Sequence, residues 1–185
     1  MNSEIELDSI IEIINKAQKI AIFTHVSPDG DAVGSSLAFY LGLLQLKKEV
    51  SIVTDEFSRC FGFLPHLGDI QREVDDCYDV SIVLDCATKG RLFDPKNSFD
   101  RSNVTVAIDH HASNTYFAKL NYVEGNSPAT CKTLVKVFKR LGITLTKEIG
   151  SCLMAGIITD SGGLRYDTVD DETFEFAASM LDLGV

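Results

Sequence analysis

The stretch that decides the fold is KIAIFTHVSPDGDAVGSS, residues 19–36. An apolar run from Ile20 to Phe23 leads to His25, and two acids then flank a glycine in Asp29-Gly30-Asp31. A short apolar run of this kind is typical of a buried strand, and open α/β sheets bind their ligands just beyond the carboxyl ends of strands. We therefore expect a strand that ends in a polar site.

The same arrangement occurs again further along the chain. The run Val80 to Leu84 precedes Asp85, the run Val104 to Ile108 precedes Asp109-His110-His111, and another apolar stretch ends at Thr159-Asp160. Surface acids would be scattered rather than recur at strand ends, so we expect these groups to converge. Strands that alternate with helical patterns predict an α/β fold with a mostly parallel β-sheet flanked by helices.

The converging side chains offer only nitrogen and oxygen donors. They are His25, Asp29, Asp31, Asp85, Asp109, His110, His111 and Asp160. Such a set suits Mn²⁺ or Mg²⁺ and lacks the thiolates that a structural zinc site favours. Carboxylates held close together either keep protons or recruit cations, and two divalent ions would relieve the repulsion here.

Each of these residues also has a simpler structural explanation. Asp29-Gly30-Asp31 fits a turn that caps the next helix, and this explanation is compatible with metal binding. His25 fits a strand-end histidine, Asp109 could hold its neighbouring histidines from outside the site, and Asp85 and Asp160 fit caps or loop acids. Four such clusters in one order favour a common site over four coincidences.

At these residues the sequence resembles the DHH phosphoesterase superfamily, which includes the RecJ exonucleases. The motifs of that family stand here in order as HVSPDGDAVGSS, VLDC, AIDHH and GIITDSGG. The likeness runs from about Ile20 to the C-terminus and is greatest to the bifunctional oligoribonuclease (nanoRNase) and pAp-phosphatase branch. It implies that residues 1–185 form a DHH-type N-terminal catalytic domain. The substrate-binding second domain of full-length members is absent from this chain, so we expect metal binding with weak turnover.

The resemblance also implies roles for individual residues. One Mn²⁺ ion would be held by His25, Asp29 and Asp85, and the second by Asp31, Asp85, His110 and Asp160, with Mg²⁺ or Co²⁺ as alternative metals. His111 and Asp109 would be catalytic, with His111 turned away from its neighbour toward the phosphate. Two such ions about 3.5 to 4 Å apart activate a water as hydroxide for in-line attack, so no covalent enzyme intermediate is needed.

The function predicted first is a manganese-dependent phosphoesterase that hydrolyses short oligonucleotides, 3′-phosphoadenosine 5′-phosphate (pAp), or both. One alternative is a pyrophosphatase or a cyclic-dinucleotide phosphodiesterase, and another is a metal- or nucleotide-binding module without turnover. The amides of the helix that begins near Gly30 would attract a phosphate. We name Ser35, Lys89, Arg91 and Arg165 as candidate substrate contacts.

Composition limits the partners. The 185 residues include 17 basic and 27 acidic side chains, for a net charge of −10, which disfavours long duplex DNA because its binding depends on basic residues. The chain has no apolar run long enough for a membrane span, and its first residues are acidic, so we expect a cytoplasmic protein with no membrane partner. A homodimer is also considered. Five cysteines without a CxxC pair are expected to stay reduced.

The remaining pattern predicts further elements. We expect a first helix that carries Leu7 to Ala17, a second from Asp31 to Leu46, a strand near Val50 to Thr54, an irregular stretch from Phe57 to Leu67, a polar loop from Asp94 to Asn103, and helices at Ala129 to Leu141, Lys147 to Thr159 and Asp171 to Leu183. In the last helix Phe174, Ala177, Ala178 and Leu181 recur at helical spacing and are expected to contact the core.

Overall fold

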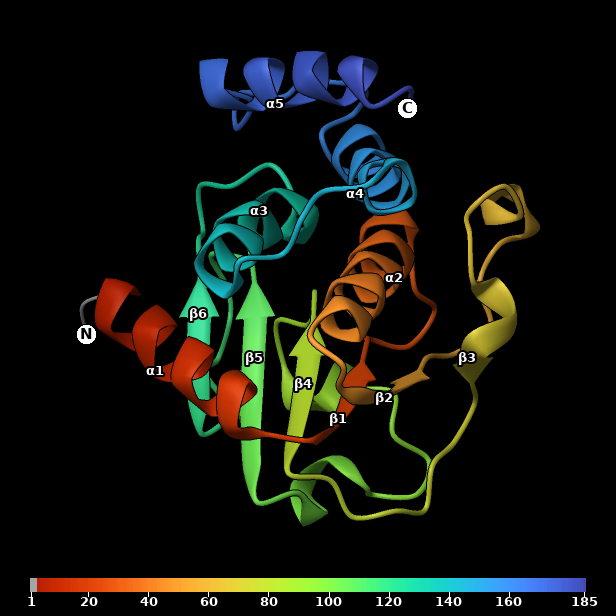
Figure 1. The fold of residues 1–185 in the computed structure, drawn as a ribbon, viewed down its shortest axis with the longest axis vertical. Helices are drawn as coiled ribbons and strands as arrows, with labels where there is room; N and C mark the ends of the chain where they lie inside the picture. The colour runs from red at the N-terminus through yellow and green to blue at the C-terminus, as the bar shows by residue number, and fades with distance from the viewer. Residues whose placement is uncertain (1–2) are drawn as a thin grey trace.

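The fold is built on one parallel sheet, as the computed structural model of the chain shows for residues 3–185 (Figure 1). Within these residues the sheet has six strands in the order β3-β2-β1-β4-β5-β6, and every pairing is parallel. The strands are β1 (Lys19–Phe23), β2 (Glu49–Val53), β3 (Ile70–Gln71), β4 (Val80–Leu84), β5 (Val104–Asp109) and β6 (Leu120–Val123). The α/β fold predicted from the sequence is confirmed.

The helices form layers on one side of this sheet (Figure 1). They are α1 (Ser3–Lys16), α2 (Gly30–Gln45), α3 (Thr130–Leu141), α4 (Lys147–Asp160) and α5 (Asp171–Asp182). Helices α1, α2 and α3 contact the strands, α4 packs on α2 and α3, and α5 packs on α4. Among residues 3–185 no helix is both long and apolar enough to cross a membrane.

The two faces of the sheet bury different clusters. Because side chains alternate along a strand, Ile20 and Ile22 point into the main core beneath the helices, whereas Ala21 and Phe23 point to the opposite face. There they join a smaller core that loops and a short 3-10 turn supply, including Phe99. The sheet is therefore buried on both faces, which explains why its central strands are continuous apolar runs.

Two strands were not predicted from the sequence. The strand β3 has two residues, and β6 lies in a polar stretch and has four, so neither carries a recognisable period. The helix expected at Lys147 to Thr159 is α4, and Asp160 is its last residue. The irregular stretch at residues 57–67 and the polar loop at 94–103 contain only short 3-10 turns.

The prediction for α5 was wrong in its orientation. The side chains of Phe174 and Leu181 are 53% and 72% exposed, and Ala178 is also exposed. The buried residues of this helix are Thr173, Phe176 and Met180, whereas Ala177 is only partly buried. The helix is the outermost layer and packs mainly on α4, so only a narrow stripe of it is covered.

Glycines let α2 and α4 approach closely. A Cβ atom added to Gly34 would lie 2.4 Å from the carbonyl oxygen of Cys152, and one added to Gly156 would lie 2.6 Å from Oδ1 of Asp31. Both neighbours belong to the packed interface and cannot swing aside as the end of a flexible side chain would. The contact places the start of α2 against the end of α4.

We predict that Gly34→Ala lowers the free energy of unfolding by about 1 to 3 kcal/mol, because a methyl group forced into a packed interface must displace the helices. Urea unfolding measures the change. The matched control is Gly68→Ala, where a new Cβ meets nothing within 4 Å. Equal stability of the two variants would contradict the close packing of α2 on α4.

Candidate metal centre

The central strands bring three parts of the sequence together. Strands β1, β4 and β5 are neighbours and run parallel, so the segments that follow them leave the same edge of the sheet. His25 follows β1 after one residue, Asp85 follows β4 directly, and Asp109 is the last residue of β5. The end of α4 adds Asp160 from above this edge.

Asp85 lies at the middle of the cluster and is 2% exposed. Its Oδ1 is 3.5 Å from Nε2 of His110, and its Oδ2 is 3.6 Å from Nε2 of His25. The hydroxyl of Thr130 donates to Oδ1 at 3.2 Å. The backbone of Asp85 has φ of 55°, a left-handed conformation that is uncommon outside glycine and is often found at functional sites. The two carboxylate oxygens thus face two different histidines.

Backbone carbonyls orient both of these histidines. Nδ1 of His25 lies 2.8 Å from the carbonyl of Val26, and Nδ1 of His110 lies 3.1 Å from the carbonyl of Ser127. A carbonyl only accepts, so each Nδ1 carries the proton and each Nε2 is left to face the acids. This is the orientation in which protein histidines bind metals. Burial lowers the pKa of His25, but the nearby carboxylates of Asp29 and Asp85 outweigh it and raise that pKa to about 10.

One carboxylate oxygen of Asp29 caps α2, and the other faces the cluster. Its Oδ1 accepts from the amides of Asp31 and Ala32 and so caps α2, as the turn chemistry predicted. Its Oδ2 lies 3.8 Å from Nε2 of His25. Burial raises the pKa of this carboxyl, but bonds from His25 and the cap amides bring it down to about 2.

Asp31 is fully buried, and α3 supplies its partners. The amides of Thr130 and Cys131 donate to its two oxygens at 2.6 and 2.9 Å. The residue before α3 is Ala129, which has no capping side chain, so the carboxylate of Asp31 fills that role from another helix. Burial and the carboxylate of Asp85 nonetheless raise the pKa of Asp31 well above its usual value.

Asp160 closes the cluster on the side of α4. Its Oδ2 is 3.2 Å from Nε2 of His110, and its side chain is 32% exposed. Burial raises its pKa; the charge of His110 opposes this, and the charges of Asp85 and Asp29 add to the increase. A carboxylate at the C-terminus of a helix also faces the negative end of the helix dipole, so this acid gains from a nearby cation.

The donor set fits divalent cations. Three overlapping groups have ligand atoms within 4.8 Å of one another: His25 with Asp29 and Asp85, Asp31 with His110 and Asp160, and Asp85 with His110 and His111. Donors at about 2.1 Å from one ion lie about 3 to 4 Å apart, which is the spacing seen between these nitrogens and oxygens. The six residues expected as ligands are therefore brought together.

His111 does not point away from His110 as expected. The two rings are 4.5 Å apart between centroids, because β5 ends at Asp109 and the alternation of an extended strand ends there too. Nδ1 of His111 lies 2.8 Å from Oδ1 of Asp109, and this hydrogen bond raises the pKa of His111 to about 9. Asn114 donates to the other oxygen of Asp109 at 2.6 Å. Asp109 is fully buried, so it positions His111 rather than reaching a substrate.

The candidate substrate contacts differ in their access to the centre. Ser35 is fully buried and donates to the carbonyl of Ala32 inside α2, so its assignment as a substrate contact was wrong. Nη2 of Arg91 lies 3.2 Å from Nδ1 of His25, beside the cluster. Lys89 forms an ion pair with Asp100, and Arg165 donates to the carbonyl of Gly162. Both of those side chains come from segments that flank the centre.

Three residues that support the cluster were not singled out from the sequence. They are Asn114, Ser127 and Thr130. The only sequence signal for them is indirect: the helix that begins at Thr130 follows Pro128-Ala129 and lacks a polar residue at its cap. Free amides at a buried helix start require an acceptor from elsewhere, and the nearest acids in the predicted site were available for that role.

Several known proteins resemble this chain in sequence. The DHH family, N-terminal domain, matches residues 19–157. A bifunctional oligoribonuclease and PAP phosphatase NrnA from Thermus thermophilus is 35% identical over 169 residues, which are 90% of this chain and 50% of that protein. A protein of the same name from Mycoplasma genitalium is 30% identical over 186 residues, covering 93% of this chain and 56% of that protein.

Solved structures show the same fold. An exopolyphosphatase-related protein from Bacteroides fragilis superposes with a TM-score of 0.87 at 27% identity, over 98% of this chain and 57% of that one. A putative family II inorganic pyrophosphatase from Methanococcus jannaschii gives a TM-score of 0.63 at 18% identity, over 89% of this chain and 55% of that one. The chain spans about half the length of the curated relatives it matches.

We predict that the metal-free protein loses stability as the pH rises from about 6.5 to 9. The folded pKa values of His25 and His111, about 10 and about 9, exceed the ordinary value of 6.5. The folded state therefore keeps protons that the unfolded state releases, so this stabilisation is complete below pH 6.5 and is lost as the pH rises through 9. The raised pKa of Asp31 acts in the same direction. Urea unfolding in EDTA measures the effect.

Excess Mn²⁺ should reverse this dependence, because cations bind the deprotonated ligands and gain affinity as the pH rises. Asp182→Asn, a change at an exposed acid of α5, should leave both dependences unchanged. A metal-free protein that is equally stable across this range would show that the histidines do not hold extra protons.

Proposed function

This chain belongs to the DHH family, and we propose that it is a manganese-dependent phosphoesterase domain that hydrolyses short oligonucleotides, pAp, or both. The family match to residues 19–157 and the oligoribonuclease and PAP phosphatase relatives support hydrolysis of a phosphoester. The relatives are about twice as long as this chain, so we further propose that a second domain contributes to substrate binding in a full-length protein. Cytoplasmic location and a homodimer stay predictions from the sequence.

One observation carries the proposal: Asp85 has two oxygens that face two separate histidine and carboxylate groups. We assign His25, Asp29 and Asp85 to one Mn²⁺ ion and Asp31, Asp85, His110 and Asp160 to the other. A carboxylate shared in this way would be a ligand of both ions. When bound, the two cations lower the pKa of a water and stabilise the charge of the phosphoryl group.

The remaining residues of the centre position other side chains or supply positive charge. His111 is held by Asp109 through Nδ1, and its ring is 36% exposed, so Nε2 is free to donate to a phosphate oxygen. The hydrogen bond to Asp109 raises the pKa of this imidazole, and the protonated ring would stabilise negative charge on the phosphoryl group. Arg91, beside His25, adds a second cationic donor.

The ligand assignment predicts opposite results for two variants. Asp85→Asn should remove at least one equivalent of bound Mn²⁺ and lower hydrolysis by more than about 100-fold, since residues that merely orient a metal ligand already cost 10- to 100-fold. Asparagine tolerates the left-handed backbone of this position, so the fold should be kept. His111→Gln should keep both ions and lower kcat by about 100- to 1,000-fold, as for the loss of one donor to the developing charge.

Metal content by atomic emission and kcat on a dinucleotide measure both effects, with Asp182→Asn as the control at an exposed acid. Full activity and two bound ions in Asp85→Asn would overturn the shared-ligand assignment. Loss of metal from His111→Gln would instead place His111 in the third group of the cluster, as a ligand with Asp85 and His110.

The substrate class is tested by comparing pAp, a ribodinucleotide, a cyclic dinucleotide and pyrophosphate in parallel with Mn²⁺ and with Mg²⁺. We expect the highest kcat/KM for pAp or the dinucleotide and higher rates with Mn²⁺, because two histidines make the site softer than an all-oxygen magnesium site. Fastest hydrolysis of pyrophosphate or of the cyclic dinucleotide would overturn the proposed substrate. Binding of all four without turnover would indicate a nucleotide-binding module.

A further inference from the structure

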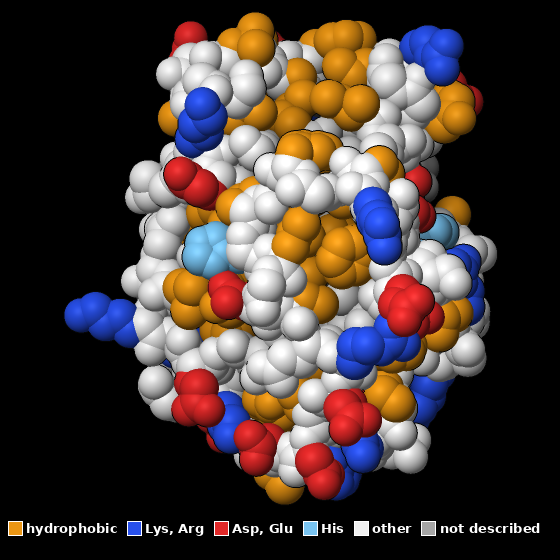
Figure 2. All heavy atoms as spheres, turned by 90° about the vertical axis from the view of Figure 1, so that its right-hand side faces the viewer, with side chains coloured by type: hydrophobic (Ala, Val, Ile, Leu, Met, Phe, Trp, Pro, Cys, Tyr) orange, Lys and Arg blue, Asp and Glu red, His pale blue; other side chains and the backbone are white. Residues whose placement is uncertain are grey.

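An apolar groove runs along α4 on the side away from α3. Its volume is about 690 Å³, within the usual range for small-molecule sites. Figure 2 shows apolar side chains gathered around a hollow on this face. The apolar lining comes mostly from α4 and from the loop after β2, including Phe61, Phe63, Pro65, Met154 and Ile158, and Val185 completes it.

One end of the groove adjoins the metal centre. Thr159 lines that end, and the next residue is Asp160. A Cβ atom added to Gly30 would lie 2.3 Å from Oγ1 of Thr159, so the residue that follows Asp29 packs on the same side chain. Asp160 is therefore one residue away from the groove, and Asp29 is next to a glycine that packs on its lining. The groove therefore begins beside the segment that carries Asp160.

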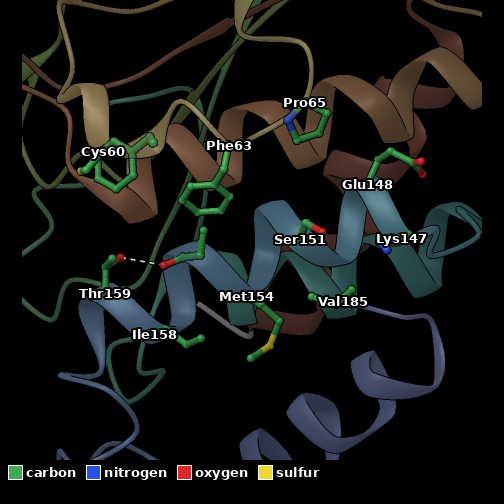
Figure 3. A pocket seen from close by; sticks show the side chains of 12 residues that line it. Cys60, Phe63, Pro65, Lys147, Glu148, Ser151, Met154, Ile158, Thr159 and Val185 are labelled. Atoms are coloured by element: carbon green, nitrogen blue, oxygen red, sulfur yellow. Dashed lines mark hydrogen bonds between the residues drawn. The ribbon is translucent and has the colours of Figure 1, made fainter.

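Phe63 gives the groove an exposed aromatic wall. Its side chain is 70% exposed, and Figure 3 shows its ring between the loop and α4, between Thr159 at one end and Lys147 at the other. Met154 stands five residues before Thr159, about 7.5 Å along the helix axis.

The charge of the lining favours a neutral, flat occupant. Lys147 and Glu148 are its only charged side chains, and they offset each other at the end far from the metals. The hydroxyl of Thr159 is already used, since it donates to the carbonyl of Ala155 at 2.8 Å. The groove thus offers apolar and aromatic surface with no net charge, in a protein of net charge −10. A second phosphate would gain no net electrostatic attraction there. An uncharged base would gain apolar and aromatic contacts.

We propose that this groove holds the nucleobase of the substrate, with the base on Phe63 and the attached phosphate at the metal centre. The proposal rests on the proposed function, because it requires a nucleotide at the metals. Stacking on an aromatic side chain tolerates every base, so the groove would select nucleotides over simple phosphates without selecting a sequence. It would supply binding energy remote from the reacting phosphate and thereby position that phosphate.

Methionine methyl groups report on the groove directly. The sequence has three methionines: Met154 lines the groove, Met180 is buried in the core, and Met1 is the first residue. With ¹³C-methyl methionine and Mg²⁺, which does not broaden the signals, AMP should shift the Met154 resonance while the Met180 resonance stays in place. Ribose 5-phosphate, which lacks only the base, should leave both resonances unchanged. Met154→Leu assigns the signal.

Two phenylalanine variants provide the matched comparison. Phe63→Ala should weaken AMP binding by about tenfold, the loss expected for one stacked base, and should leave binding of ribose 5-phosphate unchanged by calorimetry. Phe174→Ala removes a ring that is 53% exposed on α5 and does not line the groove. This variant should therefore bind AMP and ribose 5-phosphate as the unchanged protein does. Equal affinity for AMP in the Phe63 and Phe174 variants would overturn the proposal.

The outcomes separate this proposal from the proposed function. AMP binding that shifts Met154 in a protein that hydrolyses no substrate would support the groove and contradict the phosphoesterase. Hydrolysis of a dinucleotide with no shift at Met154 and no effect of Phe63→Ala would support the phosphoesterase and contradict the base site in the groove. A Met154 signal that moves with protein concentration alone would assign the groove to a second copy of the chain and overturn the base site.

Discussion

The repulsion between buried carboxylates is the constraint on which this structure depends. Asp31 and Asp85 are almost fully buried, and Asp160 is partly buried beside them. Like charges this close must keep protons or recruit cations, and burial together with the neighbouring carboxylates accordingly raises the pKa values of Asp31 and Asp160. Residues that contribute little to the core, such as Thr130, are placed to donate to these acids.

The sheet and helices are arranged to hold the acids in spite of that cost. Parallel order brings the ends of β1, β4 and β5 to one edge, and the glycine contacts between α2 and α4 bring Asp31 toward Asp160. The amides at the start of α3 then donate to Asp31. A larger residue at Gly156 would press on Asp31 itself. The geometry of the metal centre therefore depends directly on how closely the helices pack.

The sequence could predict the parts of the centre that follow the strands, because apolar runs of this length leave little choice of element. It could not predict the orientation of α5, where Phe174 and Phe176 are both apolar and only the position of α4 decides which is buried. Ser35 was misjudged for a related reason: it follows the polar site closely in sequence but lies on the inner side of α2. The position of His111 depended on where β5 ends, and an apolar run does not fix that point to one residue.

The structural and the metal-binding explanations of each acid are also not exclusive, since a carboxylate has two oxygens. Asp29 caps α2 with Oδ1 and faces His25 with Oδ2, so the capping pattern in the sequence is real and still does not argue against a ligand. Asp31 likewise caps α3 while its Oδ2 lies 3.9 Å from Nε2 of His110. Amides that fix a carboxylate in place also leave its remaining lone pairs in a defined direction. Helix starts at this edge of the sheet therefore make the acids both less costly to bury and better oriented for a cation.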